Sequence, residues 1–439
     1  MRLSTDERAF FADRRAAVLD RLGPDEALLV FGANHHLRNG DAEYPYRQDS
    51  DLWYLTGWPD PESALIIRPG HEHPTQLFVQ PKDPEREVWT GIRPGTEGAL
   101  EQFGVDAAQT IDCLKDTLAE LLVGVRTLHY RVGEDPEHDR LVLGAAAKAR
   151  RPARKVGQPV PDAFVSPGRL LGELRLFKTE HELDLLRTAA GITADAHIAA
   201  MKAAKPGMME YELEALINYT FRSRGGNGPG YTTIVGSGAN ACVLHYVTND
   251  SPLPPDGLVL VDAGCEFRNY TADVTRTFPA SGRFTKAQAE VYEVVLAAQL
   301  ASIDACRAGR TFDEVHQISV RTLTEGMVSL GLLEGEVDAL IEDESFKKYY
   351  MHGTSHWLGI DVHDTGSYVA EGGSRPLSPG MVLTIEPGLY IAPDDEDAPE
   401  RLRGIGIRIE DDVLVTEDEP DVLTAACPKT LADVEAACS

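Results

Sequence analysis

The stretch from 258 to 278 limits the possible folds of this chain more than any other, because it places two carboxylates in a short β-hairpin. Its first residues are a run of Leu and Val typical of a buried strand, and its last five have the composition of a partner strand. A turn closing at Phe267 and Arg268 would pair Asp262 with Asp273, with Cβ atoms about 5 Å apart. Two ionised carboxylates so placed repel each other unless a cation neutralises them. This stretch alone therefore predicts a metal site, a different hairpin register, or simply two exposed aspartates near a turn.

Composition narrows the functional classes. The chain has 439 residues, 43% hydrophobic and 26% charged, which is typical of a soluble protein with two or three globular domains. A net charge of -28 disfavours nucleic acid and anionic membranes as partners; it fits an enzyme that holds divalent cations, or a solvated acidic surface. The six cysteines lack CxxC spacing, and no apolar run approaches the ~18 residues of a membrane span. We therefore expect a cytoplasmic protein without disulfides, bound neither to membrane nor to nucleic acid.

The first part of the chain alternates helical and strand-like segments. Residues 4–22 predict a helix that begins with a capping box at Ser4 and Glu7. Strand-like runs follow at 27–31, 64–67 and 76–79. The pattern predicts a mixed α/β domain up to about residue 165. Within it, the aromatic segment 44–57 favours a packed domain interface or direct substrate contact equally.

A change of organisation follows the turn residues 166–168, and we expect two domains, residues 1–172 and 173–439. In the second, a long helix leads to Gly207–Glu212 and another helix, and about a hundred residues later the same order returns with Gly309–Glu314. Two such helix pairs, each followed by β-rich sequence, predict an internally duplicated α/β domain with a site between its halves. A coincidence of helix-breaking glycines is the alternative.

Residues 352–364 carry the histidines 352, 356 and 363, in a chain with 13 histidines in total. A single buried histidine is usually a hydrogen-bonded core residue, but three together favour a site for metal binding or proton transfer. The four-residue spacing of His352 and His356 is also that of a helical zinc motif. We reject this helical interpretation, because the intervening Gly, Thr and Ser form a poor helix and the required Glu is absent.

Two glutamates in apolar strands complete the polar set. Glu386 ends the run 381–386, and Glu410 follows Arg408 in a second run. A carboxylate inside an apolar strand is costly unless it is paired or metal-bound, so both are candidate ligands, with an Arg408–Glu410 ion pair as the alternative. With two aspartates and a histidine, they form a set that prefers Mn²⁺, with Co²⁺ or Zn²⁺ possible. Four carboxylates suffice for two ions, which are suited to amide hydrolysis.

These residues carry a family resemblance. Asp262, Asp273, His356, Glu386 and Glu410, in this order and at these spacings, resemble the five metal ligands of the pita-bread metallopeptidases. The segments HGTSHWLGIDVHD, TIEPGLYI, YPYRQDSDLWYLTG and LTAACPKTLADVE resemble the aminopeptidase P (Xaa-Pro aminopeptidase) branch, over nearly the whole chain. The resemblance implies an α/β (α+β) protein with an aminopeptidase P-type N-terminal domain and a duplicated pita-bread catalytic domain.

The resemblance also implies roles for single residues. Asp273 and Glu410 would bridge two Mn²⁺ ions, His356 and Glu386 would complete one ion's coordination, and Asp262 the other's. Glu386 would also accept the proton of the attacking hydroxide or water.

Further roles concern the groups around the metals. His363 would stabilise the tetrahedral intermediate, His352 would line the proline side and His245 would contact the scissile carbonyl. Arg408 would orient the ligands. Trp89 matches a residue that reaches a neighbouring subunit's pocket in a homo-oligomer, a dimer or a tetramer.

The implied activity is release of the N-terminal residue from peptides with proline second, by attack of a hydroxide that bridges the two metals. The substrate's free amino group would lie near Asp262. Prolidase, an Xaa-Pro dipeptidase on the same fold, is the nearest alternative. Methionine aminopeptidase is less favoured because it does not need the residues before 173, and a non-catalytic pita-bread binding protein does not need all four carboxylates.

Overall fold

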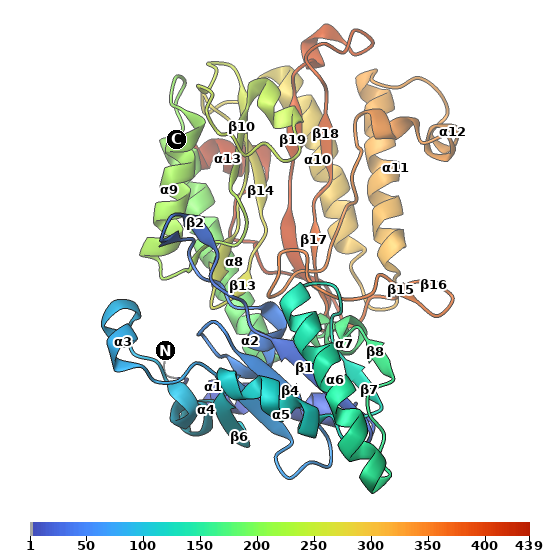
Figure 1. Ribbon diagram of the computed structural model, residues 1–439. Helices are drawn as coiled ribbons and strands as arrows, with labels where there is room; N and C mark the ends of the chain where they lie inside the picture. Colours follow the sequence, from blue (N-terminus) through green and yellow to red (C-terminus); the bar gives the residue numbers. More distant parts are fainter. Residues whose placement is uncertain (1–2) are drawn as a thin grey trace. The chain divides into compact units, whose positions relative to one another are not determined.

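The computed structural model describes residues 3–439, and the chain divides into two compact units, Met1–Leu174 and Arg175–Ser439 (Figure 1). Both units combine helices with β-strands, which confirms the predicted α/β class. Among the described residues, no helix combines the length and the apolar character that a membrane span requires.

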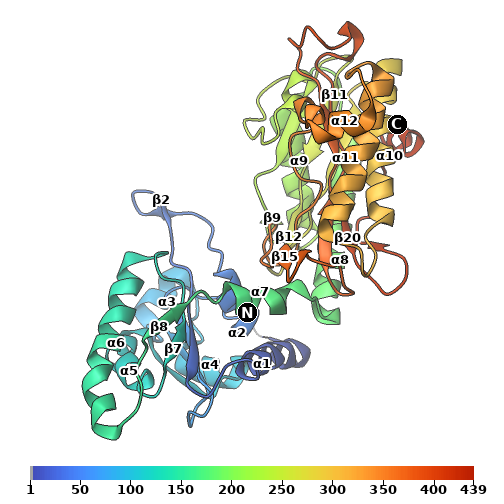
Figure 2. The ribbon, with the colours of Figure 1, turned by 90° about the vertical axis from the view of Figure 1, so that its right-hand side faces the viewer.

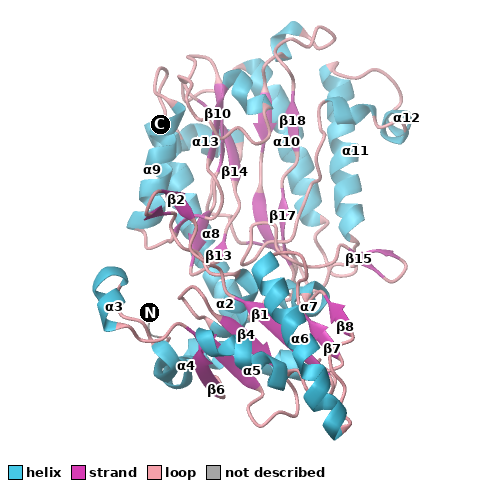
Figure 3. Cartoon of the chain, in the orientation of Figure 1, coloured by secondary structure: helices cyan, strands magenta, loops and turns pink. Residues whose placement is uncertain are grey.

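The first unit is built on a six-stranded sheet in the order β6-β5-β4-β1-β7-β8. Helices α5 and α6 cover one face of the sheet (Figure 3). Their Leu, Val and Ala side chains pack there against alternate residues of the strands. The strands of the sheet are β1 (Glu26–Phe31), β4 (Ala64–Ile67), β5 (Thr75–Val79), β6 (Ala107–Thr110), β7 (Thr127–His129) and β8 (Ala163–Val165), and a separate two-stranded sheet joins β2 (Leu37–Asn39) and β3 (Ala42–Glu43). The three strands predicted from apolar runs are therefore confirmed as β1, β4 and β5.

The helices of this part are α1 (Thr5–Leu19), α2 (Ser50–Thr56), α3 (Pro84–Thr90), α4 (Gly95–Phe103), η1 (Ile111–Cys113), α5 (Leu114–Leu121), α6 (Pro136–Val156) and α7 (Gly168–Leu176). The capping box predicted for the first of them is confirmed, since Ser4 and Glu7 exchange hydrogen bonds at the start of α1. The aromatic segment 44–57 contains α2, whose Trp53 and Tyr54 rings meet Phe rings of α1 edge to face.

The second unit consists of two similar halves. Each half has a pair of packed helices, α8 with α9 and α10 with α11 (Figure 2), and a three-stranded antiparallel sheet, β10-β11-β14 or β17-β20-β21. Its helices are α8 (Glu180–Ala203), α9 (Glu210–Ser223), η2 (Gly238–Cys242), α10 (Lys286–Asp304), α11 (Phe312–Leu330), α12 (Val337–Glu342), η3 (Ser345–Lys348), η4 (Glu400–Leu402) and α13 (Leu431–Ala437).

The strands of the second unit are mostly short. They are β9 (Gly228–Pro229), β10 (Ile234–Ser237), β11 (Leu258–Asp262), β12 (Cys265–Phe267), β13 (Tyr270–Thr271), β14 (Thr275–Pro279), β15 (Val369–Ala370), β16 (Gly373–Ser374), β17 (Val382–Ile385), β18 (Gly388–Tyr390), β19 (Gly406–Arg408), β20 (Asp411–Leu414) and β21 (Asp421–Val422). Smaller sheets join β13-β12-β9, β18-β19 and β15-β16.

The repeat predicted from Gly207–Glu212 and Gly309–Glu314 is confirmed, and it has a physical basis. Each glycine has a left-handed backbone, with φ of 85° and 88°, and donates its N–H to a leucine carbonyl, Leu253 or Leu377, at 2.9 Å. Each glutamate accepts the backbone N–H three residues before it, at 2.8 and 2.6 Å. The same turn therefore ties each helix pair to the β-rich segment that follows.

Gly309→Ala should lower the free energy of unfolding by about 1 to 2 kcal/mol, because an L-residue is strained at positive φ even though no atom lies within 4 Å of the added Cβ. Gly191→Ala, inside α8 and equally uncrowded, is the matched control and should raise stability by up to ~1 kcal/mol. Urea unfolding would measure both. Changes of the same sign would contradict the account.

Candidate metal centre and active site

The hairpin that carries the two aspartates exists, but the predicted pairing of Asp262 with Asp273 is wrong. Asp262, the last residue of β11, pairs with Thr275 of β14. The turn falls at Arg268 and Asn269, whose φ angles of 49° and 67° are those of a two-residue type I′ turn. Asp273 is therefore a diagonal neighbour of Asp262, and it lies on the same face of the hairpin because side chains alternate with a period of two.

Tyr231 and Arg408 contact this pair of carboxylates. The Tyr231 hydroxyl lies 2.6 Å from Asp262 Oδ1 and 2.5 Å from Asp273 Oδ1, and it can donate to one of them at a time. Arg408 donates from Nη2 to Asp262 Oδ2 at 2.6 Å. Its Nε and Nη1 donate to the hydroxyls of Thr275 and Tyr390, each at 3.0 Å. The ion pair of Arg408 is thus with Asp262, and the alternative expectation of an Arg408–Glu410 pair is wrong.

Glu386 and Glu410 lie opposite each other, where a second antiparallel ladder opens. β17 pairs with β20 and β18 with β19 in one register, and the two glutamates fall between these pairs. Their backbone N–H groups turn to other partners: Glu386 donates to the Thr354 carbonyl at 2.8 Å and Glu410 to the Thr275 carbonyl at 3.0 Å. The Thr275 hydroxyl also donates to Glu410 Oε2 at 2.7 Å. Glu410 is thereby attached to β14, in the other half of the unit.

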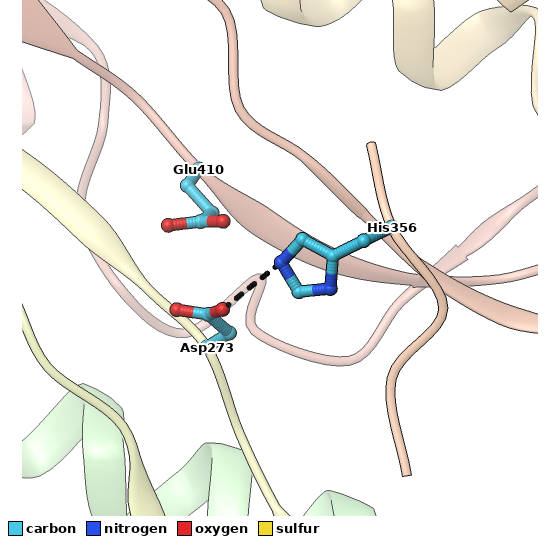
Figure 4. A group of neighbouring side chains, drawn as sticks. All are labelled: Asp273, His356 and Glu410. Atoms are coloured by element: carbon cyan, nitrogen blue, oxygen red, sulfur yellow. Dashed lines mark ion pairs between the residues drawn. The ribbon is translucent and has the colours of Figure 1, made fainter. Parts of the chain in front are cut away.

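The histidine-rich segment 352–364 contains neither helix nor named strand, as expected, and runs beside β17. The His356 carbonyl accepts the Thr384 N–H at 3.0 Å. Nδ1 of His356 lies 3.1 Å from the Trp357 carbonyl, which assigns the ring proton to Nδ1. Nε2, free to bind a cation, points at Asp273 Oδ2, 3.3 Å away (Figure 4).

The other three candidate histidines line the same cavity. The His363 ring stands perpendicular to the His356 ring, with centroids 4.4 Å apart. His352 Nε2 lies 2.8 Å from the Tyr390 hydroxyl, and its Nδ1 lies 3.8 Å from Glu386 Oε2. His245 is exposed on the loop that follows η2.

The cavity has a volume of about 440 Å³. One part of its lining is polar and contains all five predicted ligands, the three further histidines and Arg408. The remainder is mainly apolar, formed by Ile234, Leu244, Val247 and Val362. The structure therefore brings every predicted site residue of the second unit together. Trp89 lies in the first unit, on α3, with 88% of its surface exposed.

The carboxylates of the cavity favour a bound cation. Burial, together with Asp273, Glu386 and Asp262, raises the pKa of Glu410 well above its usual value. Burial also raises the pKa of Glu386 to about 7, although His356 and Arg408 oppose the shift. Four carboxylates, of which Asp273 and Glu410 are buried, stand beside one arginine and form an acceptor-rich group that a divalent cation would stabilise in the ionised form.

Three of the predicted ligands form a compact group. Ligand atoms of Asp273, His356 and Glu410 all lie within 4.8 Å of one another, and Figure 4 shows the three side chains pointing toward a common point. Asp262 adjoins Asp273 through Tyr231, and Glu386 Oε1 lies 3.7 Å from His356 Nε2. The oxygen-rich set with one imidazole fits a hard or borderline divalent metal.

Sequence reasoning missed Tyr231 and Thr275, which bond to the candidate ligands, and Tyr390, which connects His352 to Arg408. Tyr231 follows a glycine-rich turn, and Tyr390 stands inside the TIEPGLYI segment without any spacing signal of its own. Thr275 lies on the predicted strand that carries the second aspartate, so period-two alternation places its side chain on the same face as Asp273. That alternation is the one signal that could have found it.

Comparison with known proteins agrees with this geometry. Residues 184–417 match the model of metallopeptidase family M24, and residues 11–129 match that of the aminopeptidase P N-terminal domain. The Xaa-Pro aminopeptidase of Escherichia coli (strain K12) is 44% identical over 99% of this chain and 98% of its own length. Human Xaa-Pro aminopeptidase 3 is 36% identical over 95% of this chain and 82% of its own.

Solved structures give the same result. An aminopeptidase of Pseudomonas aeruginosa superimposes with a TM-score of 0.96 and 45% identity, covering 100% of this chain and 98% of that one. A glutamate-to-alanine variant of Escherichia coli aminopeptidase P in complex with substrate gives a TM-score of 0.94 and 43% identity, covering 100% and 99%.

A duplicated fold around four carboxylates and a histidine defines a metal-dependent hydrolase. The chain belongs to metallopeptidase family M24 and, within it, to the aminopeptidase P (Xaa-Pro aminopeptidase) family.

Thr275→Val should weaken metal binding by about 10- to 100-fold, because the hydroxyl that joins Arg408 Nε to Glu410 is lost. Thr324→Val is the matched control: Thr324 is equally buried, but its hydroxyl donates only to the Val320 carbonyl within α11. Titration of the apoprotein with Mn²⁺ against a competing chelator would measure both. Equal metal affinity in the two variants would refute the role assigned to Thr275.

Proposed function

We propose that this protein is a manganese-dependent Xaa-Pro aminopeptidase, which releases the N-terminal residue from peptides that have proline second. The observation that carries the proposal is the convergence of four carboxylates and His356 in one cavity, with three more histidines around it. Its membership of the Xaa-Pro aminopeptidase family supports the same substrate class.

We propose that two divalent ions would be held by these five residues: Asp273 and Glu410 would serve both ions, His356 and Glu386 one of them, and Asp262 the other. The proximity of Asp273, His356 and Glu410 supports this arrangement. The carboxylate-rich set favours Mn²⁺, with Co²⁺ or Zn²⁺ as alternatives, and a related aminopeptidase P is described as zinc-substituted. When bound, the two ions would lower the pKa of a water molecule and polarise the scissile carbonyl.

The residues around the ligands then perform separate tasks. Glu386 accepts the proton of the attacking water, and His363 donates to the oxyanion that develops on the carbonyl. His245, on the loop that follows η2, contacts the scissile carbonyl. Arg408 fixes the orientation of Asp262, as the 2.6 Å contact between them suggests.

Selectivity for the first peptide bond and for proline requires different features. Asp262 attracts the substrate's free ammonium group, which limits cleavage to the N-terminal residue. The nitrogen of the Xaa-Pro amide carries no hydrogen, so proline is recognised by shape and stacking. His352, held by the Tyr390 hydroxyl at 2.8 Å, lines the side of the cavity assigned to proline.

We further propose that the protein acts as a cytoplasmic homo-oligomer, a dimer or a tetramer, with residues 1–172 and 173–439 as its two functional domains. The segment around α3 supports assembly, since Val88, Trp89 and Ile92 are each more than 80% exposed. Trp89 is the residue proposed to reach a neighbouring subunit.

The product pattern tests the substrate class. After loading with Mn²⁺, the protein should release the first residue from an Xaa-Pro-Yaa peptide, and a chelator should abolish the reaction, because the carboxylate group then lacks its cations. Mass spectrometry identifies the products. Cleavage of an Xaa-Pro dipeptide alone would reassign the protein as a prolidase, and no cleavage of either would favour a non-catalytic binding role.

Two variants separate a ligand from a catalytic donor. Glu410→Ala should abolish turnover together with binding of one metal ion. His363→Ala should keep the full metal content and lower kcat by about 100-fold, the usual effect of removing one oxyanion donor. Elemental analysis beside steady-state kinetics measures both. Full turnover of Glu410→Ala with two ions bound, or extensive metal loss in His363→Ala, would contradict these assignments.

A further inference from the structure

One buried carboxylate outside the metal centre accepts hydrogen bonds from both ends of the loop that carries His245. Glu210, the first residue of α9, is fully buried, whereas the loop, residues 238–251, begins with η2 and belongs to the connection between the strands β10 and β11. No role in the proposed reaction accounts for a glutamate at this position. Its contacts do account for it.

Five donors converge on the Glu210 carboxylate. Oε1 accepts the Ser237 N–H at 2.7 Å, the Ser237 hydroxyl at 2.8 Å and Asn240 Nδ2 at 3.1 Å, all at the beginning of the loop. Oε2 accepts the Tyr246 hydroxyl and the Ser251 N–H at 2.9 Å each, near the end of the loop. Both ends of the loop are therefore attached to one side chain.

The loop places reacting groups between these anchors. Leu244, His245 and Val247 line the metal cavity, and Tyr246, the residue next to His245, is bonded to Glu210. Asn249 adds a second anchor with its amide, which accepts the Val235 N–H and donates to the Thr233 carbonyl, each at 2.9 Å. His245 itself is exposed, so its position depends on how firmly the loop is held.

We propose that Glu210 is the positioning residue for His245: its carboxylate fixes the loop so that the imidazole meets the scissile carbonyl. The inference rests on the proposed function, because it takes the role of His245 from it. Glu210 acts through the loop and not through the metals, since its bonds go to the loop and to none of the five candidate ligands.

An amide cannot replace this carboxylate. A carboxylate offers acceptor oxygens alone, whereas Gln presents an NH₂ group to donors that already point at the site. Glu210→Gln therefore deprives at least two donors of their bond to residue 210 and releases one end of the loop. Because small displacements of a catalytic group are costly, kcat/KM should fall by about 10- to 100-fold.

The test is a double-mutant cycle of Glu210→Gln and His245→Ala. If Glu210 acts through His245, adding Glu210→Gln to His245→Ala should lower kcat/KM by less than about 2-fold further, because the group it positions is already absent. Metal content should be unchanged in all three variants. A multiplicative loss in the double variant would overturn the inference and leave Glu210 with a general structural role.

A matched control and a milder variant keep the result interpretable. Glu182→Gln removes another fully buried helix-start carboxylate, which caps α8 and contacts Tyr270; its effect should multiply with that of His245→Ala. Tyr246→Phe removes a single donor to Glu210. It should lower kcat/KM less than Glu210→Gln does, and it should have little further effect when added to His245→Ala. If the effects of Tyr246→Phe and His245→Ala on kcat/KM simply multiply, the result would count against the inference, even if Glu210→Gln fails to fold.

Amide hydrogen exchange tests this inference without relying on enzymatic activity, and so independently of the proposed function. Glu210→Gln, or Tyr246→Phe in its place, should speed amide exchange across 238–251 while β11 and β14 keep their protection. Unchanged exchange of the loop would overturn the inference even in an active enzyme. An inactive wild-type protein would refute the proposed function, and exchange would still report whether Glu210 fixes the loop.

Discussion

The mutual repulsion of four carboxylates, two of them buried and two largely buried, is the constraint on which the second unit depends. One arginine, Arg408, reaches them, and its ion pair goes to Asp262 alone. Hydroxyls of Tyr231 and Thr275 supply the further donors, which reduce the repulsion but add no charge. A buried carboxylate costs several kcal/mol unless it is compensated, so the arrangement is stable in the ionised form only when cations complete it. Metal binding and the folding of this region are therefore linked.

Successive side chains of β14 point to opposite faces of the strand, and this alternation supports the metal centre from behind. Along β14, the buried Thr275 bonds to Glu410 and Arg408 of the metal centre, and the next residue, Arg276, points to the other face of the strand and is also fully buried. Arg276 donates to the Glu410 carbonyl, to Asp411 Oδ1 at 2.6 Å and to the carbonyls of Cys427 and Pro428. One guanidinium thus joins β14, β20 and the C-terminal tail. The tail, which carries none of the candidate ligands, is thereby attached to the strands behind the metal centre.

The ligands could be predicted from sequence because each stands at the end of an apolar strand or in a histidine-rich segment, and because the whole set resembles a known family. Their connections could not. The turn at Arg268 and Asn269 lacks the Gly that usually marks positive φ, so the hairpin register was misplaced. Tyr231 and Glu210 act on residues far away in the chain, and no local pattern indicates such partners.

The duplicated halves are not used identically. In the first, Asp262 and Asp273 are diagonal neighbours at the break between the β11–β14 and β12–β13 ladders; in the second, Glu386 and Glu410 lie directly opposite each other at the break between β17–β20 and β18–β19. Opening a ladder is costly only if the released N–H groups find no acceptor. Here both find one: the Glu386 N–H bonds to Thr354 of the histidine loop, and the Glu410 N–H bonds to Thr275 of the first half. The irregularity therefore unites the two halves and the histidine loop around one centre, which two regular hairpins could not do.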